Sequence, residues 1–134
     1  MILNRIMNAI KELKEDTADT GWIDCELEDG ISGATSGFGG PAGIQYRQIG
    51  KVVYVRGSIS ATYDGSNSLL LTTLPYTPDY RTYVFDVLTG SRIARLYINV
   101  KGQLYLEWIR ALSDGNVVTS EQSWIAVKLD FTVD

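Results

Sequence analysis

The sequence contains no histidine and only one cysteine among its 134 residues. Without histidine, the serine–histidine–aspartate and cysteine–histidine arrangements of nucleophilic catalysis cannot form, and the commonest zinc ligand is missing as well. The single thiol, Cys25, cannot form a disulfide within the chain, and its place in a strand-like stretch indicates a small buried hydrophobic residue. The sequence therefore favours binding over catalysis, and it indicates neither a metal nor a cofactor.

Long apolar runs and an excess of positive charge are also lacking. No run approaches the roughly 20 apolar residues that span a bilayer, and residues 1–10 lack the features of a secretory signal. The 12 basic residues are scattered and are outnumbered by 16 acidic ones, which gives a net charge of -4. We therefore expect a chain that is synthesised in the cytoplasm, inserts into no membrane and binds no nucleic acid.

Residues 1–17 have the apolar periodicity of a helix. The spacing alternates between three and four along a seam formed by Leu3, Ile6, Ile10 and Leu13. This seam covers about two heptads, fewer than the three or four that identify a coiled coil unaided, so a helix packed on its own domain is also compatible with it. The terminal position and the polar linker at 15–21 favour self-association, and the mixture of Leu and Ile is compatible with a trimer.

From Trp22 onward the apolar period changes to two, which predicts an all-β domain over residues 18–134. The clearest strands, 51–62 and 124–133, alternate apolar and polar residues. Further strands are predicted near 22–28, 44–48, 68–74, 81–88, 92–100 and 103–112. About eight antiparallel strands with glycine-containing turns are typical of a β-sandwich or jelly-roll-like fold. The glycine-rich stretch 30–43 is predicted to be a loop or irregular arm, with a functional or a purely connecting role.

Carboxylates are the remaining route to catalysis, because a glycosidase needs only two of them across a cleft. Asp24, Glu26 and Glu28 alternate along one face of the strand predicted at 22–28, a pattern typical of a solvated surface. A cell-wall glycosidase that uses Glu26 or Asp86 is a remote alternative.

The hairpin predicted over 92–112 carries the strongest candidate for a binding site. A two-residue turn at 101–102 would place Arg95 opposite Trp108 and Tyr97 opposite Leu106. The polar and aromatic residues predicted to point away from the core are Arg95, Tyr97, Asn99, Trp108 and Arg110. Aromatic rings stack on the C–H face of a sugar while the polar groups bind its hydroxyls, so this face is predicted to bind a saccharide. The alternative is that it seals a subunit interface, with Arg95 stacked on the indole ring.

Three segments resemble the head domains of tailed-phage tail and baseplate proteins, over most of residues 21–132. They are Gly21-Trp22-Ile23, the stretch 45–57 (QYRQIGKVVYVRG), and Leu74-Pro75 followed by Pro78 and Tyr80-Arg81. Their order resembles a tryptophan-led first strand, a "YRKIGNVVYLRG"-like strand and an "LPxGYRP"-like segment, although the glycine of the last segment is missing here. The resemblance is to receptor-binding proteins of phages that infect Gram-positive bacteria.

This resemblance implies a virion protein, a homotrimer of β heads that is held by an N-terminal helical bundle and attached to other tail or baseplate proteins. It also implies recognition of host cell-wall saccharide or teichoic acid. In lactococcal members a His-x-Asp pair and a later Trp form the saccharide site, and the similarly spaced residues here are Tyr97, Asn99 and Trp108. A structural virion module that binds no ligand is the alternative.

Overall fold

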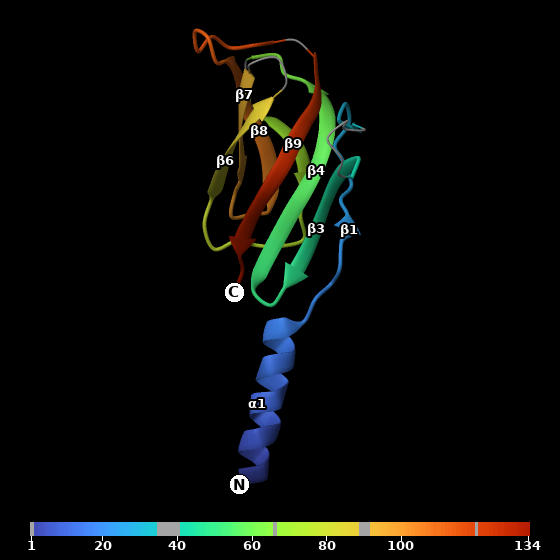
Figure 1. Ribbon diagram of the computed structural model, residues 1–134, viewed down its shortest axis with the longest axis vertical. Coiled ribbons are helices and arrows are strands. Elements are labelled where there is room, and N and C mark those ends of the chain that lie inside the picture. Colours follow the sequence, from blue (N-terminus) through green and yellow to red (C-terminus); the bar gives the residue numbers. More distant parts are fainter. Residues whose placement is uncertain (1, 35–40, 66, 89–91, 120) are drawn as a thin grey trace.

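The computed structural model describes residues 2–34, 41–65, 67–88, 92–119 and 121–134, with side chains described in these ranges except at 11–17, 85–88 and 121–124. One helix precedes two antiparallel sheets, which lie one behind the other in Figure 1. The all-β class that the period-two pattern predicts is therefore confirmed.

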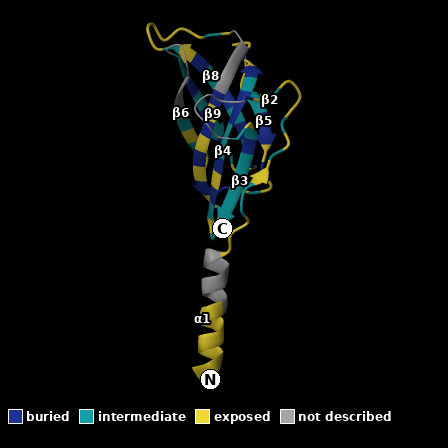
Figure 2. Cartoon of the chain, turned by 45° about the vertical axis from the view of Figure 1, so that its right-hand side comes forward, coloured by how far each residue is buried: buried dark blue, intermediate teal, exposed yellow. Residues whose placement is uncertain are grey.

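The helix α1 (Ile2–Thr17) lies where the apolar periodicity predicts it. It extends along the long axis of the molecule, away from both sheets (Figure 1). Its described side chains, at residues 2–10, are all exposed (Figure 2). Among the described residues, no helix combines the length and the apolar character that a membrane span requires. The seam residues Leu3, Ile6 and Ile10 are thus left uncovered by the residues that the structure describes, while the side chain of Leu13 lies outside the described part.

The first sheet is built around its longest inner strand, β4. Its strands are β1 (Ile23–Asp24), β2 (Ser32–Gly33), β3 (Gly43–Ile49), β4 (Val52–Thr62) and β9 (Glu121–Thr132). β3 and β9 both pair with β4, and β1 pairs with β3. The predicted inward faces are confirmed, because alternate residues of β4 and of the β9 segment are buried: Val53, Val55, Ile59, Ala61, Ile125, Val127, Leu129, Phe131 and Val133.

The second sheet has the strand order β5 (Leu69–Thr73), β8 (Gln103–Ala111), β7 (Arg92–Ile98), β6 (Thr82–Leu88). Its inward residues join those of the first sheet in one apolar cluster, which includes Ala94, Leu96, Ile98, Leu104, Leu106 and Ile109. Burial of each large aliphatic side chain contributes about 1.5–3 kcal/mol. This shared core fixes which face of each sheet points outward.

Residues 19–34 close one edge of both sheets. The backbone N–H of Cys25 donates to the carbonyl of Ile44 in β3 (2.8 Å), whereas the N–H of Glu28 donates to the carbonyl of Leu71 in β5 (2.9 Å). The strand predicted at 22–28 is therefore wrong beyond Asp24, because the chain leaves the first sheet there to reach the second. Residues 19–34, which we call the crossing segment, cover strand edges that would otherwise be free to pair with another chain. Of the predicted arm at 30–43, residues 35–40 lie outside the described part.

Candidate binding surface

The turn between β7 and β8 decides which side chains share the outer face of the second sheet. It has three residues, 100–102, rather than the predicted two. The N–H of Gly102 donates to the carbonyl of Asn99 (3.0 Å), and Gly102 has a φ of 80°, the left-handed conformation that three-residue hairpin loops place on glycine. A contact from elsewhere holds this turn, because the N–H of Leu74 donates to the carbonyl of Gly102 (2.8 Å).

The extra turn residue shifts the register of the hairpin by one position. Tyr97 pairs with Tyr105, so its predicted pairing with Leu106 is wrong. A bulge at Glu107 then restores the predicted register, and Arg95 pairs with Trp108 as expected. The shift moves Leu104 and Leu106 to the core and brings Tyr105 to the outer face.

Three tyrosines from adjacent strands line up on this outer face. Tyr83 of β6, Tyr97 of β7 and Tyr105 of β8 are successive cross-strand partners. The ring centroids of Tyr83 and Tyr97 are 5.5 Å apart, and those of Tyr97 and Tyr105 are 5.1 Å apart with an interplanar angle of 20°. These distances are those of interacting aromatic pairs. We call these three residues the tyrosine ladder.

Two arginines pack over the tyrosine ladder. The Arg81 guanidinium lies 5.0 Å from the Tyr97 ring centroid and donates to the Tyr83 hydroxyl (3.1 Å). The Arg95 guanidinium lies 4.1 Å from the Tyr83 ring, and its Nε is 2.8 Å from a carboxylate oxygen of Glu107. Cation–π contacts at these distances orient the arginine side chains and keep the rings in place. The surface thus combines flat apolar rings with directional donors.

The structure brings together only part of the predicted site. Arg95 and Tyr97 belong to the tyrosine ladder region, and Trp108 lies beside them, half-buried against the core with the Arg110 guanidinium 4.9 Å from its ring. Asn99 instead belongs to the turn, where its Oδ1 accepts the N–H groups of Lys101 and Gln103, both at 3.0 Å. Those two bonds occupy the Oδ1 acceptor that a ligand hydroxyl would need.

Sequence reasoning missed Arg81, Tyr83 and Tyr105. Tyr83 and Tyr97 occupy the same register position on neighbouring strands, but pairing between β6 and β7 cannot be read without the length of their connection. For Tyr105, a signal was present: glycine as the last of three turn residues is the pattern of a three-residue hairpin loop.

The carboxylates at the crossing segment lie at the surface, and Glu26 and Glu28 line a pocket of about 240 Å³ together with Asp29 and Thr73. Asp24, Glu26 and Glu28 are exposed, and the Asp24 carboxylate accepts a hydrogen bond from Gln45 (2.8 Å). The part of the chain that the structure describes contains no group of three or more histidine, cysteine or acidic residues arranged to hold a metal ion. The side chain of Asp86 lies outside that part.

Cys25 is half-buried against the core rather than fully buried. Burial raises the pKa of its thiol to about 11, and this outweighs a hydrogen bond with Thr72 that lowers it. A thiol with so little thiolate at neutral pH is a poor nucleophile.

Comparisons with models of known protein families, with curated proteins and with solved structures found no match to this chain.

Proposed function

We propose that the chain is a receptor-binding or baseplate head of a tailed phage, which assembles as a homotrimer through α1 and binds host cell-wall saccharide without catalysis. In this proposal the two sheets are the layers of a β-sandwich, and the helices form a parallel bundle that connects the heads to other tail or baseplate proteins. The phage assignment is supported by the sequence resemblance over residues 21–132.

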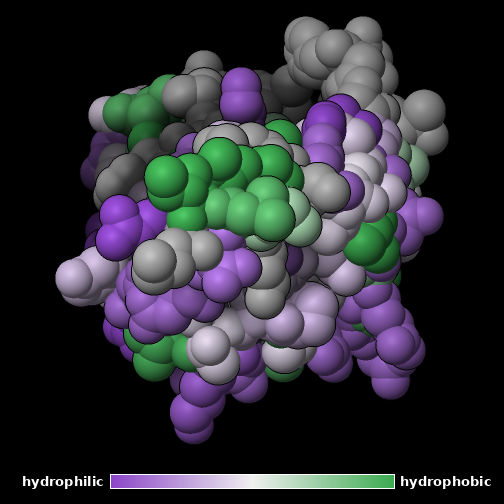
Figure 3. Space-filling view, turned by 90° about the horizontal axis from the view of Figure 1, so that it is seen from below, coloured by the Kyte–Doolittle hydropathy of each residue, from purple (hydrophilic) through white to green (hydrophobic). Residues whose placement is uncertain are grey.

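The uncovered seam of α1 is the observation that carries the proposal. Leu3 is 68% exposed, Ile6 51% and Ile10 43%, and Ile2 and Met7 widen the apolar stripe at 75% and 58% (Figure 3). A 16-residue helix is marginal in water unless it packs on something. Identical seams on other copies provide that surface, and an apolar stripe wider than two positions per heptad suits a bundle of more than two helices.

The tyrosine ladder supports the saccharide as ligand. Its rings contribute apolar surface beside the two arginines, against which the C–H groups of a pyranose would pack, and Arg81 provides donors at its margin. The bulge at Glu107 is a common device beside binding sites, because it re-aims the side chains on one strand.

A pair of substitutions at Tyr97 tests this proposal. Tyr97→Ala removes the central ring and should weaken binding to host cell walls at least tenfold, whereas Tyr97→Phe keeps the ring and should retain most of the binding. Ile49→Ala, on the other sheet, is the control for non-specific loss. Binding is measured by adsorption to host cells and on a glycan array, with circular dichroism to confirm that each variant is folded.

Two outcomes would contradict the proposed ligand site. If Tyr97→Ala adsorbs as well as the unmodified protein, the tyrosine ladder does not bind the receptor. If instead it lowers the mass of the particle in light scattering, the tyrosine ladder seals a subunit interface, as the structural-module alternative predicts.

A further inference from the structure

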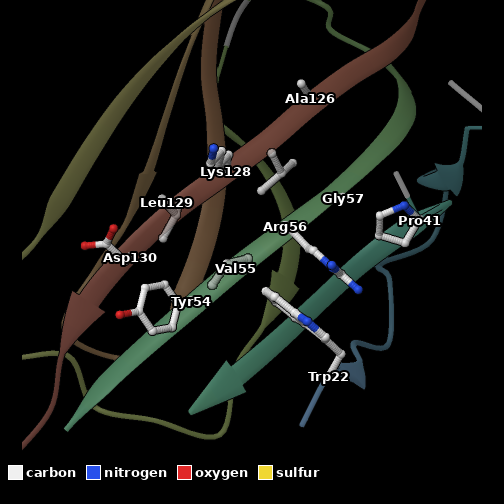
Figure 4. A pocket seen from close by; sticks show the side chains of 11 residues that line it. Trp22, Pro41, Tyr54, Val55, Arg56, Gly57, Ala126, Lys128, Leu129 and Asp130 are labelled. Atoms are coloured by element: carbon white, nitrogen blue, oxygen red, sulfur yellow. The ribbon is translucent and has the colours of Figure 1, made fainter. Parts of the chain in front are cut away.

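A second surface, on the outer face of the first sheet, contains an open hollow of about 720 Å³. Its floor is formed by β4 and β9, and Trp22 and Pro41 form one wall (Figure 4). Tyr54, Arg56, Lys128 and Asp130 of the two strands also line the hollow. We call it the Trp22 hollow; it lies on the opposite sheet from the tyrosine ladder.

Two cations leave neighbouring strands on the floor of the Trp22 hollow, and the Arg56 guanidinium is turned toward Trp22 (Figure 4). Arg56 of β4 and Lys128 of β9 are direct cross-strand partners, so their side chains leave the sheet on the same face. Like charges in this arrangement repel and are disfavoured in sheets unless something compensates them. Within the described ranges, no carboxylate lies within 4.0 Å of either cation, although Asp130 is only two residues from Lys128.

The Arg56 side chain is held in position without being neutralised. Its guanidinium lies 3.8 Å from the Trp22 ring centroid, and its Nε donates to the Gln45 amide oxygen (3.1 Å). The Gln45 amide nitrogen in turn donates to Asp24 (2.8 Å). Neither terminal nitrogen of Arg56 makes a hydrogen bond to a described residue. The two N–H groups that can bind a carboxylate or phosphate in a bidentate manner therefore remain available to a ligand.

Trp22 is also fixed from the other direction. The preceding linker is tied to β3, where the Asp19 carboxylate accepts hydrogen bonds from Arg47 and the Thr20 hydroxyl accepts the N–H of Gln48 (3.0 Å). A preorganised wall beside two uncompensated cations lowers the ordering cost of binding an anion.

We propose that the Trp22 hollow binds an anionic sugar. A carboxylate or phosphate would lie between Arg56 and Lys128, the ring would pack along Trp22 and Pro41, and Asp130 would accept a hydroxyl hydrogen bond. This inference goes beyond the proposed function, because it concerns a different sheet and a charged ligand and does not depend on the tyrosine ladder.

Titration with small sugars tests the proposal on the full chain. The probes are glucuronate, glucose 6-phosphate and uncharged glucose, followed by shifts of the Trp22 indole N–H signal in NMR spectra and by calorimetry. At least one anionic probe should bind in the millimolar range and more weakly as salt is raised, while glucose should not bind. A comparison of the two anions distinguishes a carboxylate ligand from a phosphate ligand.

Charge-removing variants locate the site. Arg56→Met and Lys128→Met should each weaken binding of the anionic probe at least tenfold, whereas Lys101→Met, an exposed lysine in the β7–β8 turn, should leave it unchanged. The proposal is wrong if neither anion binds, or if Lys101→Met weakens binding as much as the other two. It is also wrong if the floor variants change only the mass of the assembly, because the occupant is then an acidic side chain of a second copy.

The two proposals fail separately. If the tyrosine ladder does not bind host cell walls, the titrations at the Trp22 hollow are unaffected by that result. If the hollow binds no anion, the Tyr97 variants still decide whether the tyrosine ladder binds host cell walls.

Discussion

At the scale of single residues, two glycines determine how closely β3 approaches β4. A Cβ atom at Gly57 would lie 1.8 Å from the carbonyl oxygen of Gly43, which precedes its cross-strand partner Ile44. Real Cβ atoms do not approach backbone that closely, so any larger residue at 57 forces the two strands apart. The inward alternation of β4 predicts a small side chain there, but only the paired backbone shows that none fits.

We predict that Gly57→Ala destabilises the protein much more than a change at a turn glycine. Gly115 is the matched control, because its φ of 74° makes Gly115→Ala strained by about 1–2 kcal/mol while nothing lies within 4 Å of the added methyl. Urea unfolding should show a loss for Gly57→Ala at least twice that for Gly115→Ala. Equal losses would show that the strand pair relaxes around the methyl group.

The ion pair between Asp19 in the linker and Arg47 in β3 leads to a second prediction at the scale of single residues. The hydrogen bond from Arg47 lowers the pKa of Asp19 from its ordinary value of 3.8 to about 2, with a further contribution from the N–H of Gly21. Because the folded pKa is depressed, the stabilisation is present above about pH 4 and is lost as the pH falls through about 2. In Arg47→Gln the pKa of Asp19, measured by NMR titration of its carboxyl group, should return toward 3.8. An unchanged pKa in that variant would show that the backbone bond alone is responsible.

At the scale of elements, α1 is predictable from sequence as a helix. Its exposed apolar side chains favour packing against a partner. The seam residues occupy the positions that face a partner in a bundle, whereas Asn8 lies on the opposite side of the helix. In the proposed bundle a charge on the seam must be desolvated, whereas a charge at Asn8 stays in water.

We therefore predict that Ile10→Asp dissociates the assembly and Asn8→Asp does not. Light scattering should give three times the chain mass of 14.8 kDa for the unmodified protein and for Asn8→Asp, and the single-chain mass for Ile10→Asp. Helical circular dichroism should fall with the mass, since the isolated helix is marginal. A single-chain mass for the unmodified protein would refute the trimer, and an unchanged mass in Ile10→Asp would show that α1 does not hold the copies together.

The hairpin of β7 and β8 shows where element-scale reasoning from sequence stops. The core face of β7, with Ala94, Leu96 and Ile98, follows from alternation and is confirmed. The prediction of which β8 residues face inward is wrong near the turn. One extra turn residue exchanges the inward and outward positions on that strand. The deciding contact is the backbone bond between Leu74 and Gly102, which joins segments far apart in the sequence. The apolar pattern within the hairpin does not reveal a contact of this kind.

At the scale of the whole molecule, most strands and most of their inward faces are predictable from sequence, but the arrangement of the strands is not. β4 and β9 pair along their length although about 60 residues separate them, and the chain from Asp19 to Ala34 contacts both sheets. Both candidate surfaces depend on such pairings. The tyrosine ladder needs β6 beside β7, and the opposed cations of the Trp22 hollow need β9 beside β4. Alternation finds residues that face outward, and only topology places them together.

The proposed trimer makes a final prediction about host adsorption. Three heads on one bundle meet a repeating wall polymer together, so the second and third contacts become intramolecular and raise apparent affinity by about 10²–10⁴ without a new contact. Ile10→Asp, as a single chain, should therefore bind a short soluble saccharide as tightly as the unmodified protein but adsorb to cells about 100-fold more weakly. Calorimetry with the soluble saccharide and an adsorption series over protein concentration measure the two quantities. Equal losses in both would mean that subunit contacts shape the site itself, and no loss in either would mean that each head binds the cell alone.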